Sequence, residues 1–385
     1  MRILARLATA GVVLLALTAG LHGADDLSGA LRTLRAVGPK GEGNEAASEA
    51  WKVVARVDVG QVGEVLKALD GANPLAANWI RTAIDSVCER SLREEGTLPQ
   101  KALEQFVLET SHDPRGRRLA YEWLVKADPK AEERIVPQFL NDPSVELRRE
   151  AVARLIEQGE AAKKAEKSEE AVRLFQEAFA AARDRDQVDL PAKRLKELGH
   201  EVDLVRHDGM IVDWMVIGPF DNTEEAGFDK VYPPETEFDV EAKYKGKRDQ
   251  VGWIPYHSKS RVGRTELYEA LAETLVDISE KLHEREVVGY ASAEFNSPKE
   301  QAVQIRSAST NALKIWVNGK LVDEHKAYHA GSQFDQFTAE AMLRKGKNRI
   351  LVKVCQNAQT QAWTEKFGFQ LRVCDAVGSG ILSEE

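Results

Sequence analysis

The sequence predicts a multidomain α + β protein, with α-solenoid-like helical repeats in the N-terminal half and an antiparallel β-sandwich of the jelly-roll type in the C-terminal half. Up to about residue 207, apolar side chains recur every three to four positions, as on the buried face of a helix. From residue 208 onward, short runs alternate apolar and polar side chains between turn residues, as antiparallel strands do. The length of 385 residues suits two or three domains. We therefore expect a helical domain over residues 25–207 and a sandwich over residues 208–385.

The first residues predict a targeting segment. Arg2 and Arg6 are followed by an apolar run, "LATAGVVLLALTAGL", and two aspartates come soon after it. This is the layout of a secretory signal peptide, and the run is shorter than the roughly 20 residues that cross a bilayer. We assign residues 1–24 to a signal peptide and expect a periplasmic or extracellular protein without stable membrane insertion after cleavage. An uncleaved N-terminal anchor is the alternative.

Charge and cysteine usage narrow the class of protein. The net charge of −9, with no concentrated basic stretch, argues against a nucleic-acid partner. The three cysteines, Cys88, Cys355 and Cys374, are too few for a disulfide framework. Export would permit a bridge between Cys355 and Cys374, and two small apolar core side chains are the alternative.

Three Asp-Pro pairs predict helix starts in the first half. In Asp113-Pro114, Asp128-Pro129 and Asp142-Pro143, the carboxylate can cap free amides and the proline fits the first turn. They follow one another at intervals of 15 and 14 residues, which predicts a repeating helix pair. A further apolar helical stripe consists of Ala171, Leu174, Phe175, Ala178 and Ala182.

Two stretches of this half resemble known repeats. "NDPSVELRREAVARL" resembles a HEAT-type repeat, and residues 166–199 resemble a single tetratricopeptide-like helix pair. Such arrays are generally interaction scaffolds, so the resemblance implies a protein partner on the helices. A helical domain that binds nothing is the alternative.

The stretch "NALKIWVNGKLVDEH", residues 311–325, predicts a hairpin. Asn318-Gly319 suits a two-residue type I′ turn, which would pair Trp316 with Leu321 and Lys314 with Asp323. Trp316 then lies on the face opposite the core, where a neighbouring segment covers it or a ligand contacts it. Residues 264–286 approach a helical stripe and predict a helix inserted among the strands.

Residues 312–357 resemble the sugar-binding-like jelly roll of family 2 glycoside hydrolases and other galactose-binding-type modules. The matching stretches are "KIWVNGKLV", "AYHAGSQFDQF" and "MLRKGKNRILVKV". The whole layout also resembles a group of exported bacterial proteins of unsettled function, in which helical repeats precede "WMVIGPFDN" and "YPPE". The resemblance implies a non-catalytic carbohydrate-binding or accessory module, because this chain has no catalytic barrel beside the jelly roll.

Aromatic side chains are the candidates for contacting a sugar, because the C–H faces of sugars stack on aromatic rings. The candidate ligand-binding residues are Trp363, Tyr328, His329, Trp316, Trp253 and Tyr256. We assign no catalytic residue, metal ligand or cofactor, since the sequence has no H-E-x-x-H, no G-x-S-x-G and no phosphate-cradling glycine loop.

The sequence therefore favours a non-catalytic exported binding protein, not an enzyme. The sandwich would contact a glycan or another cell-envelope polymer, and the helical repeats would contact protein. One alternative is a pure protein–protein assembly scaffold. The other is a carbohydrate-active enzyme that uses loop carboxylates such as Asp221, Glu224 and Glu225.

Overall fold

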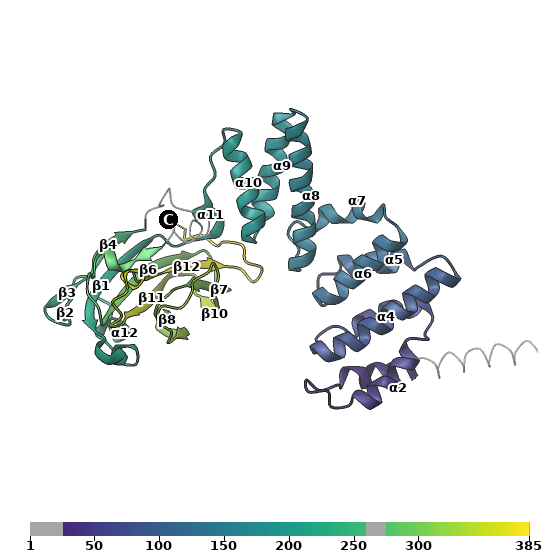
Figure 1. The fold of residues 1–385 in the computed structure, drawn as a ribbon, viewed down its shortest axis with the longest axis horizontal. Coiled ribbons are helices and arrows are strands. Elements are labelled where there is room, and N and C mark those ends of the chain that lie inside the picture. Colours follow the sequence, from purple (N-terminus) through teal and green to yellow (C-terminus); the bar gives the residue numbers. More distant parts are fainter. Residues whose placement is uncertain (1–25, 259–274, 385) are drawn as a thin grey trace, which may run out of the picture. The chain divides into compact units, whose positions relative to one another are not determined.

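The computed structural model describes residues 26–258 and 275–384, so the expected signal peptide lies outside the described residues. The chain divides into two compact units, Met1–Ala182 and Arg183–Glu385. Helices extend to Asp208 and the first strand begins at Asp213, which confirms the two-part α + β organisation (Figure 1). The sequence-based border at 207/208 marks this change of secondary structure, whereas the boundary between the two compact units lies between residues 182 and 183.

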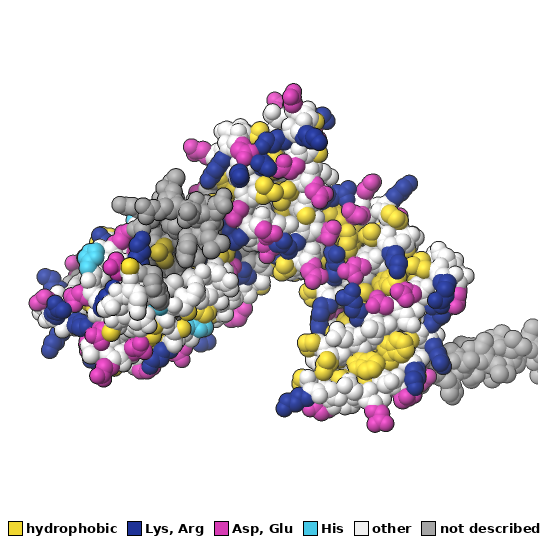
Figure 2. All heavy atoms as spheres, in the orientation of Figure 1, with side chains coloured by type: hydrophobic (Ala, Val, Ile, Leu, Met, Phe, Trp, Pro, Cys, Tyr) yellow, Lys and Arg dark blue, Asp and Glu magenta, His cyan; other side chains and the backbone are white. Residues whose placement is uncertain are grey.

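The first unit is built from helices alone in its described part. A helix covers residues 26–35. The further elements are α2 (Asn44–Val54), η1 (Val59–Gln61), α3 (Val62–Lys67), α4 (Pro74–Glu94), α5 (Gln100–Leu108), α6 (Pro114–Ala127), α7 (Ala131–Ile135), η2 (Val136–Phe139), α8 (Val145–Lys164) and α9 (Ser168–Ala181). Figure 2 shows apolar side chains gathered between these helices, bordered by acidic and basic ones. No helix in the described ranges is long and apolar enough to cross a bilayer.

Small apolar residues allow the helices of this unit to pack closely. Ala76, Ala83 and Ala120 are fully buried in a core that extends from Leu27 to Ala151. The predicted stripe on α9 is also buried from Ala171 to Ala182. Apolar spacing therefore predicted the buried face of α9 correctly.

The three Asp-Pro pairs behave differently from one another. Asp113 caps α6 as predicted, because its Oδ1 accepts a hydrogen bond from the amide of Arg115 at 2.9 Å. Helix α7 begins three residues after Asp128, and its N-cap residue is Lys130, so the prediction that Asp128 caps this helix is wrong. Helix α8 is capped by Ser144, whose hydroxyl accepts from the amide of Leu147 at 3.4 Å. The prediction that Asp142 caps α8 is therefore wrong.

The second unit begins with two helices and continues as strands. Its elements are α10 (Arg185–Glu197), α11 (Leu204–Asp208), β1 (Asp213–Asp221), η3 (Thr223–Phe228), α12 (Pro233–Thr236), β2 (Lys243–Lys245), β3 (Gln250–Gly252), β4 (Ile254–His257), β5 (Val276–Asp277), η4 (Ile278–Glu280), β6 (Val287–Ser297), β7 (Gln301–Ala308), β8 (Ala312–Val317), β9 (Lys320–His325), β10 (Phe337–Leu343), β11 (Gly346–Gln356), η5 (Ala362–Thr364) and β12 (Gly368–Cys374). A six-stranded sheet has the order β4-β1-β6-β11-β8-β9, and a four-stranded sheet has the order β10-β7-β12-β5. Neighbouring strands in both sheets are antiparallel, as expected for a sandwich.

Two apolar clusters lie on opposite faces of the six-stranded sheet. The inner cluster joins the two sheets through residues such as Trp214, Val352 and Phe369. The outer cluster combines sheet residues with Phe228, Tyr232, Val251 and Trp253 from the segment that follows β1. Residues 228–253 therefore cover the outer face of the sheet.

The hairpin of β8 and β9 confirms part of the predicted register. Trp316 pairs with Leu321, as the Asn-Gly turn predicts. A bulge follows, so Ile315 pairs with Asp323, and Lys314 forms its ion pair with Glu324 at 2.9 Å rather than with Asp323. The predicted Lys314–Asp323 pair is wrong because one extra residue is accommodated in β9.

Two further sequence predictions can be compared with this unit. The expected helix over 264–286 lies partly outside the described residues, and its described part instead forms β5 and the turn η4. Val276 and Ile278 are fully buried in the inner cluster, so tertiary packing overrides the helical spacing there.

All three cysteines are free and buried, which leaves them as apolar core side chains. Burial raises the pKa of Cys355 to about 12.

Candidate binding site at one end of the sandwich

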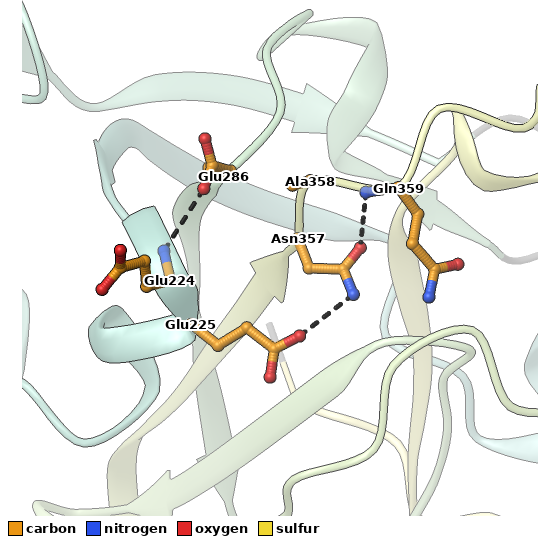
Figure 3. A pocket seen from close by; sticks show the side chains of 6 residues that line it. All are labelled: Glu224, Glu225, Glu286, Asn357, Ala358 and Gln359. Atoms are coloured by element: carbon orange, nitrogen blue, oxygen red, sulfur yellow. Dashed lines mark hydrogen bonds between the residues drawn. The ribbon is translucent and has the colours of Figure 1, made fainter.

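Three neighbouring strands of the six-stranded sheet bring their connecting segments to one end of the sandwich. Asp221 at the end of β1 and Gln356 at the end of β11 both pair with Val287 at the start of β6. The residues that adjoin these strand ends surround a pocket with a volume of about 450 Å³. It is lined by Glu224, Glu225, Glu286, Asn357, Ala358 and Gln359 (Figure 3).

Hydrogen bonds join the walls of this pocket. The Glu225 carboxylate accepts from Asn357 Nδ2 at 3.1 Å, and the Glu286 carboxylate accepts from the amide of Glu224 at 3.2 Å. Asn357 Oδ1 accepts from the amide of Gln359 at 3.1 Å. In Figure 3 the Glu225 side chain points toward Asn357, whereas the Glu224 carboxylate points away from it. Each wall is thus fixed to the next by a side chain.

The backbone of the pocket is strained at all three glutamates. The φ angles of Glu224, Glu225 and Glu286 are 55°, 62° and 53°, in the left-handed region. That region costs an L-residue about 1–2 kcal/mol, and such strain gathers at sites that bind or react. The clustering of three such residues around one pocket marks it as the candidate functional site of the second unit.

A fully buried asparagine, Asn222, joins the segments that line the pocket. The amide of Asn222 donates to the carbonyl of Glu286 at 2.8 Å, and its Nδ2 donates to the carbonyl of Gln356 at 2.9 Å. Lys247 Nζ donates to the same Glu286 carbonyl at 2.7 Å. Asn222 therefore ties the ends of β1 and β11 to the start of β6, which explains its place at the end of the "WMVIGPFDN" stretch.

Two sequence-predicted residues lie next to the pocket and support it. Tyr328 Oη accepts from Asn222 Nδ2 at 3.3 Å, and burial raises the pKa of this phenol. His329 Nε2 lies 2.9 Å from Asn357 Oδ1. The Trp363 backbone belongs to the turn η5, which follows Gln359, and its side chain lies outside what the structure describes.

The other three aromatic candidates are core residues in this structure. Trp316 and Trp253 are 9% and 8% exposed and belong to the outer cluster. Trp316 is thus covered by a neighbouring segment, which was one of its two predicted environments. Tyr256 packs in the inner cluster, and its Oη accepts from the amide of Asp277 at 3.1 Å. None of the three lines the pocket.

Sequence reasoning missed four of the six lining residues, one of which is Ala358. Glu286, Asn357 and Gln359 were not singled out, although "QNAQTQ" is an unusually amide-rich stretch for a loop between two strands. Glu224 and Glu225 were considered only as loop carboxylates.

Within residues 26–258 and 275–384, no three His, Cys, Asp or Glu side chains are arranged to hold a metal ion. The lining offers carboxylate acceptors together with amides that both donate and accept.

No protein-family model and no curated protein matches the chain. Among solved structures, a family 35 carbohydrate binding module from Clostridium thermocellum is 15% identical, covering 23% of this chain and 71% of that one, with a TM-score of 0.18. A PA14 sugar-binding domain from an RTX adhesin is 12% identical, covering 42% and 89%, with a TM-score of 0.22.

A β-glucuronidase from an uncultured Clostridium species is 17% identical over 45% of this chain, with a TM-score of 0.25. The chain spans 30% of the length of that enzyme. It spans 15% of an FMN-binding β-glucuronidase that is also similar. The chain thus has partial, low-identity likenesses to carbohydrate-binding modules and to glycoside hydrolases.

Proposed function

We propose that the second unit is a non-catalytic binding module that takes a glycan, or a comparable hydroxyl-rich polymer of the cell envelope, in the pocket beside Asn357. The observation that carries this proposal is the polar lining of that pocket. Its volume of about 450 Å³ is within the range of about 300–1,000 Å³ that ligand pockets occupy. Glu225, Glu286 and Gln359 present carboxylate and amide groups from three different segments.

The chemistry of the lining suits a sugar. Sugar hydroxyls both donate and accept hydrogen bonds, and carboxylates and amides together supply both kinds of partner. The left-handed backbone at Glu225 and Glu286 and their hydrogen bonds hold these side chains in place before a ligand arrives. Such preorganisation reduces the entropy that binding would cost.

The arrangement of the glutamates supports binding over hydrolysis. A glycosidase needs two carboxyl groups that face each other across the scissile bond, one of them able to donate a proton. Here the carboxylates of Glu225 and Glu286 each accept a hydrogen bond from a protein amide. The Glu224 carboxylate points away from Asn357 (Figure 3).

The proposal extends to location and to the first unit. The signal-like N-terminus supports export, and the HEAT-like stretch near α8 supports a protein partner for the helices. Both remain predictions from the sequence, and the pocket does not depend on them.

The test is a screen of the full chain on an array of neutral, amino-sugar and uronic-acid oligosaccharides. The strongest hit is then titrated by calorimetry against wild type, Glu225→Gln and Gln359→Ala. Each variant should weaken binding about tenfold, the loss of roughly 1.4 kcal/mol that one hydrogen bond to a charged or polar group contributes. Glu300→Gln is the matched control, because Glu300 is exposed beside Ser297, at the opposite end of β6 from Glu286.

Equal affinities for all four proteins would place the ligand elsewhere. If the protein releases reducing sugar from the hit and Glu225→Gln abolishes that release, the second unit is an enzyme and not a binding module.

A further inference from the structure

We propose that Lys353 is a positioning residue, a buried cation on β11 that anchors the segment carrying Glu224 and Glu225 and so sets the shape of the pocket. This inference rests on the proposed function of that pocket. The Lys353 side chain is 1% exposed. Its Nζ donates to the carbonyls of Phe228 and Lys230 at 3.0 and 2.7 Å, and to the Glu235 carboxylate at 2.9 Å.

All three acceptors belong to one short segment. Two residues separate the strained pair, Glu224 and Glu225, from residues 228–235. Lys353 is on β11, four residues before Asn357. One side chain therefore ties the segment that forms one wall of the pocket to the strand that ends in the opposite wall. An ammonium group has three N–H donors, so these three bonds satisfy it completely.

Two tyrosines and Glu235 surround the Lys353 ammonium group. Tyr290 Oη also donates to Glu235, and the rings of Tyr232 and Tyr290 lie 5.5 and 5.7 Å from Nζ. Burial lowers the pKa of Lys353, and the bond to Glu235 opposes that shift. A buried ion pair gives little net stability over an apolar pair of similar volume, so specific placement of the segment is its better-supported role.

The strained turn is clamped on both sides by β11. Before it, Asn222 Nδ2 donates to the Gln356 carbonyl, and after it, Lys353 Nζ donates to the Phe228 carbonyl. Two consecutive left-handed glutamates persist only where their surroundings over-determine them. If the second clamp is removed, residues 223–227 can relax to ordinary φ angles, and the Glu225 side chain then leaves Asn357.

The test compares Lys353→Met with Lys347→Met in the full chain. Lys347 is the matched control, since it is on the same strand, is 76% exposed and pairs with Glu294 at 2.8 Å. Hydrogen-exchange mass spectrometry should show at least tenfold faster exchange over residues 223–236 in Lys353→Met, with β6, β11 and β12 still protected. Affinity for the sugar identified on the array should fall at least tenfold. Lys347→Met should match wild type in both measurements.

A double variant, Lys353→Met with Glu235→Met, covers the case in which the unpaired Glu235 carboxylate unfolds the single variant. It removes both charges but still leaves the carbonyls of Phe228 and Lys230 without their donor. Fast exchange over 223–236 and weak sugar binding in the double variant would support positioning. Wild-type exchange over 223–236 would overturn it. If wild type binds no sugar, the proposed function fails, and the exchange measurement alone decides whether Lys353 positions the segment.

Discussion

Arg117 and Asp142 form a buried, bidentate ion pair inside the helical unit. Their Nη1–Oδ1 and Nη2–Oδ2 distances are 2.8 and 2.5 Å, and the side chains are 1% and 4% exposed. Arg117 Nε also donates to the Val107 carbonyl at 2.7 Å, and Asp142 accepts from the amide of Ser144 at 2.8 Å. The pair thus joins α5 and α6 to the residues that begin α8.

Replacing Arg117 with Met should lower the free energy of unfolding by about 3–5 kcal/mol, because the Asp142 carboxylate would stay buried without its partner. Urea unfolding of the full chain measures the loss of stability, and hydrogen exchange shows in which of the two units it occurs. Arg134→Met is the control, since the Arg134–Glu104 pair is partly exposed and should contribute less than about 1 kcal/mol. Similar small losses in both variants would mean that water reaches Asp142.

Gly159 on α8 should be intolerant of alanine. A Cβ there would lie 2.7, 2.9 and 3.0 Å from three ring atoms of Phe175 on α9. Gly159→Ala should therefore destabilise the first unit by about 1–3 kcal/mol through overpacking, although alanine favours a helix by about 1 kcal/mol. Thermal and urea unfolding measure the change.

Gly63 on α3 provides the matched control, because a Cβ there would meet nothing within 4 Å. Gly63→Ala should stabilise by up to about 1 kcal/mol. Phe175→Leu should recover part of the loss in Gly159→Ala by removing the ring. If Gly159→Ala behaves like Gly63→Ala, the α8–α9 contact is looser than the structure shows.

Sequence alone predicts the division into helices and strands because periodicity is a local property. The Asn318-Gly319 turn likewise fixes the pairing of Trp316 with Leu321. The bulge that follows was not predictable, because it depends on how β9 fits the rest of the sandwich. The role of Asp142 was also missed, since its partner Arg117 is 25 residues away in sequence.

The candidate site was less predictable than the fold for a similar reason. Aromatic residue type pointed to Trp253 and Trp316, but both are covered when residues 228–253 fold over the outer face of the sheet. The pocket forms where Glu225, Glu286 and Asn357 meet, and the pairing of β1 and β11 with β6 brings them together. Nothing in the local sequence of any one of these residues indicates that proximity.

Glu224→Gly should raise the free energy of unfolding by about 1 kcal/mol, because glycine adopts the φ of 55° without the penalty that an L-residue has. Chemical denaturation of the second unit measures it. Glu300→Gly serves as the control, since Glu300 is not among the residues with positive φ and glycine there should destabilise by up to about 1 kcal/mol. A loss of stability in Glu224→Gly would show that the turn holds no strain at this residue.

Asp335 should make the stability of the second unit sensitive to acid. Burial by itself raises the pKa of Asp335, but hydrogen bonds and charge from Arg372 and Arg306, at 2.7 and 2.8 Å, outweigh burial and hold the pKa below its ordinary value. A carboxyl with a depressed folded-state pKa stabilises the fold above its unfolded pKa of about 3.9, and that contribution is lost as the pH falls through the folded value. Asp335→Asn should therefore be less stable than wild type at pH 7 and should show a shallower loss of stability from about pH 4 downward.

Urea unfolding of the second unit at a series of pH values measures both effects. Asp229→Asn is the control, because Asp229 forms an exposed pair with Lys326 at 2.8 Å. The loss of stability of Asp229→Asn below about pH 4 should follow that of wild type closely, since exposed pairs are screened by solvent. If Asp335→Asn loses stability below about pH 4 as steeply as wild type does, other carboxyl groups cause the acid sensitivity. Arg372 and Arg306 then do not hold Asp335 in its ionised form.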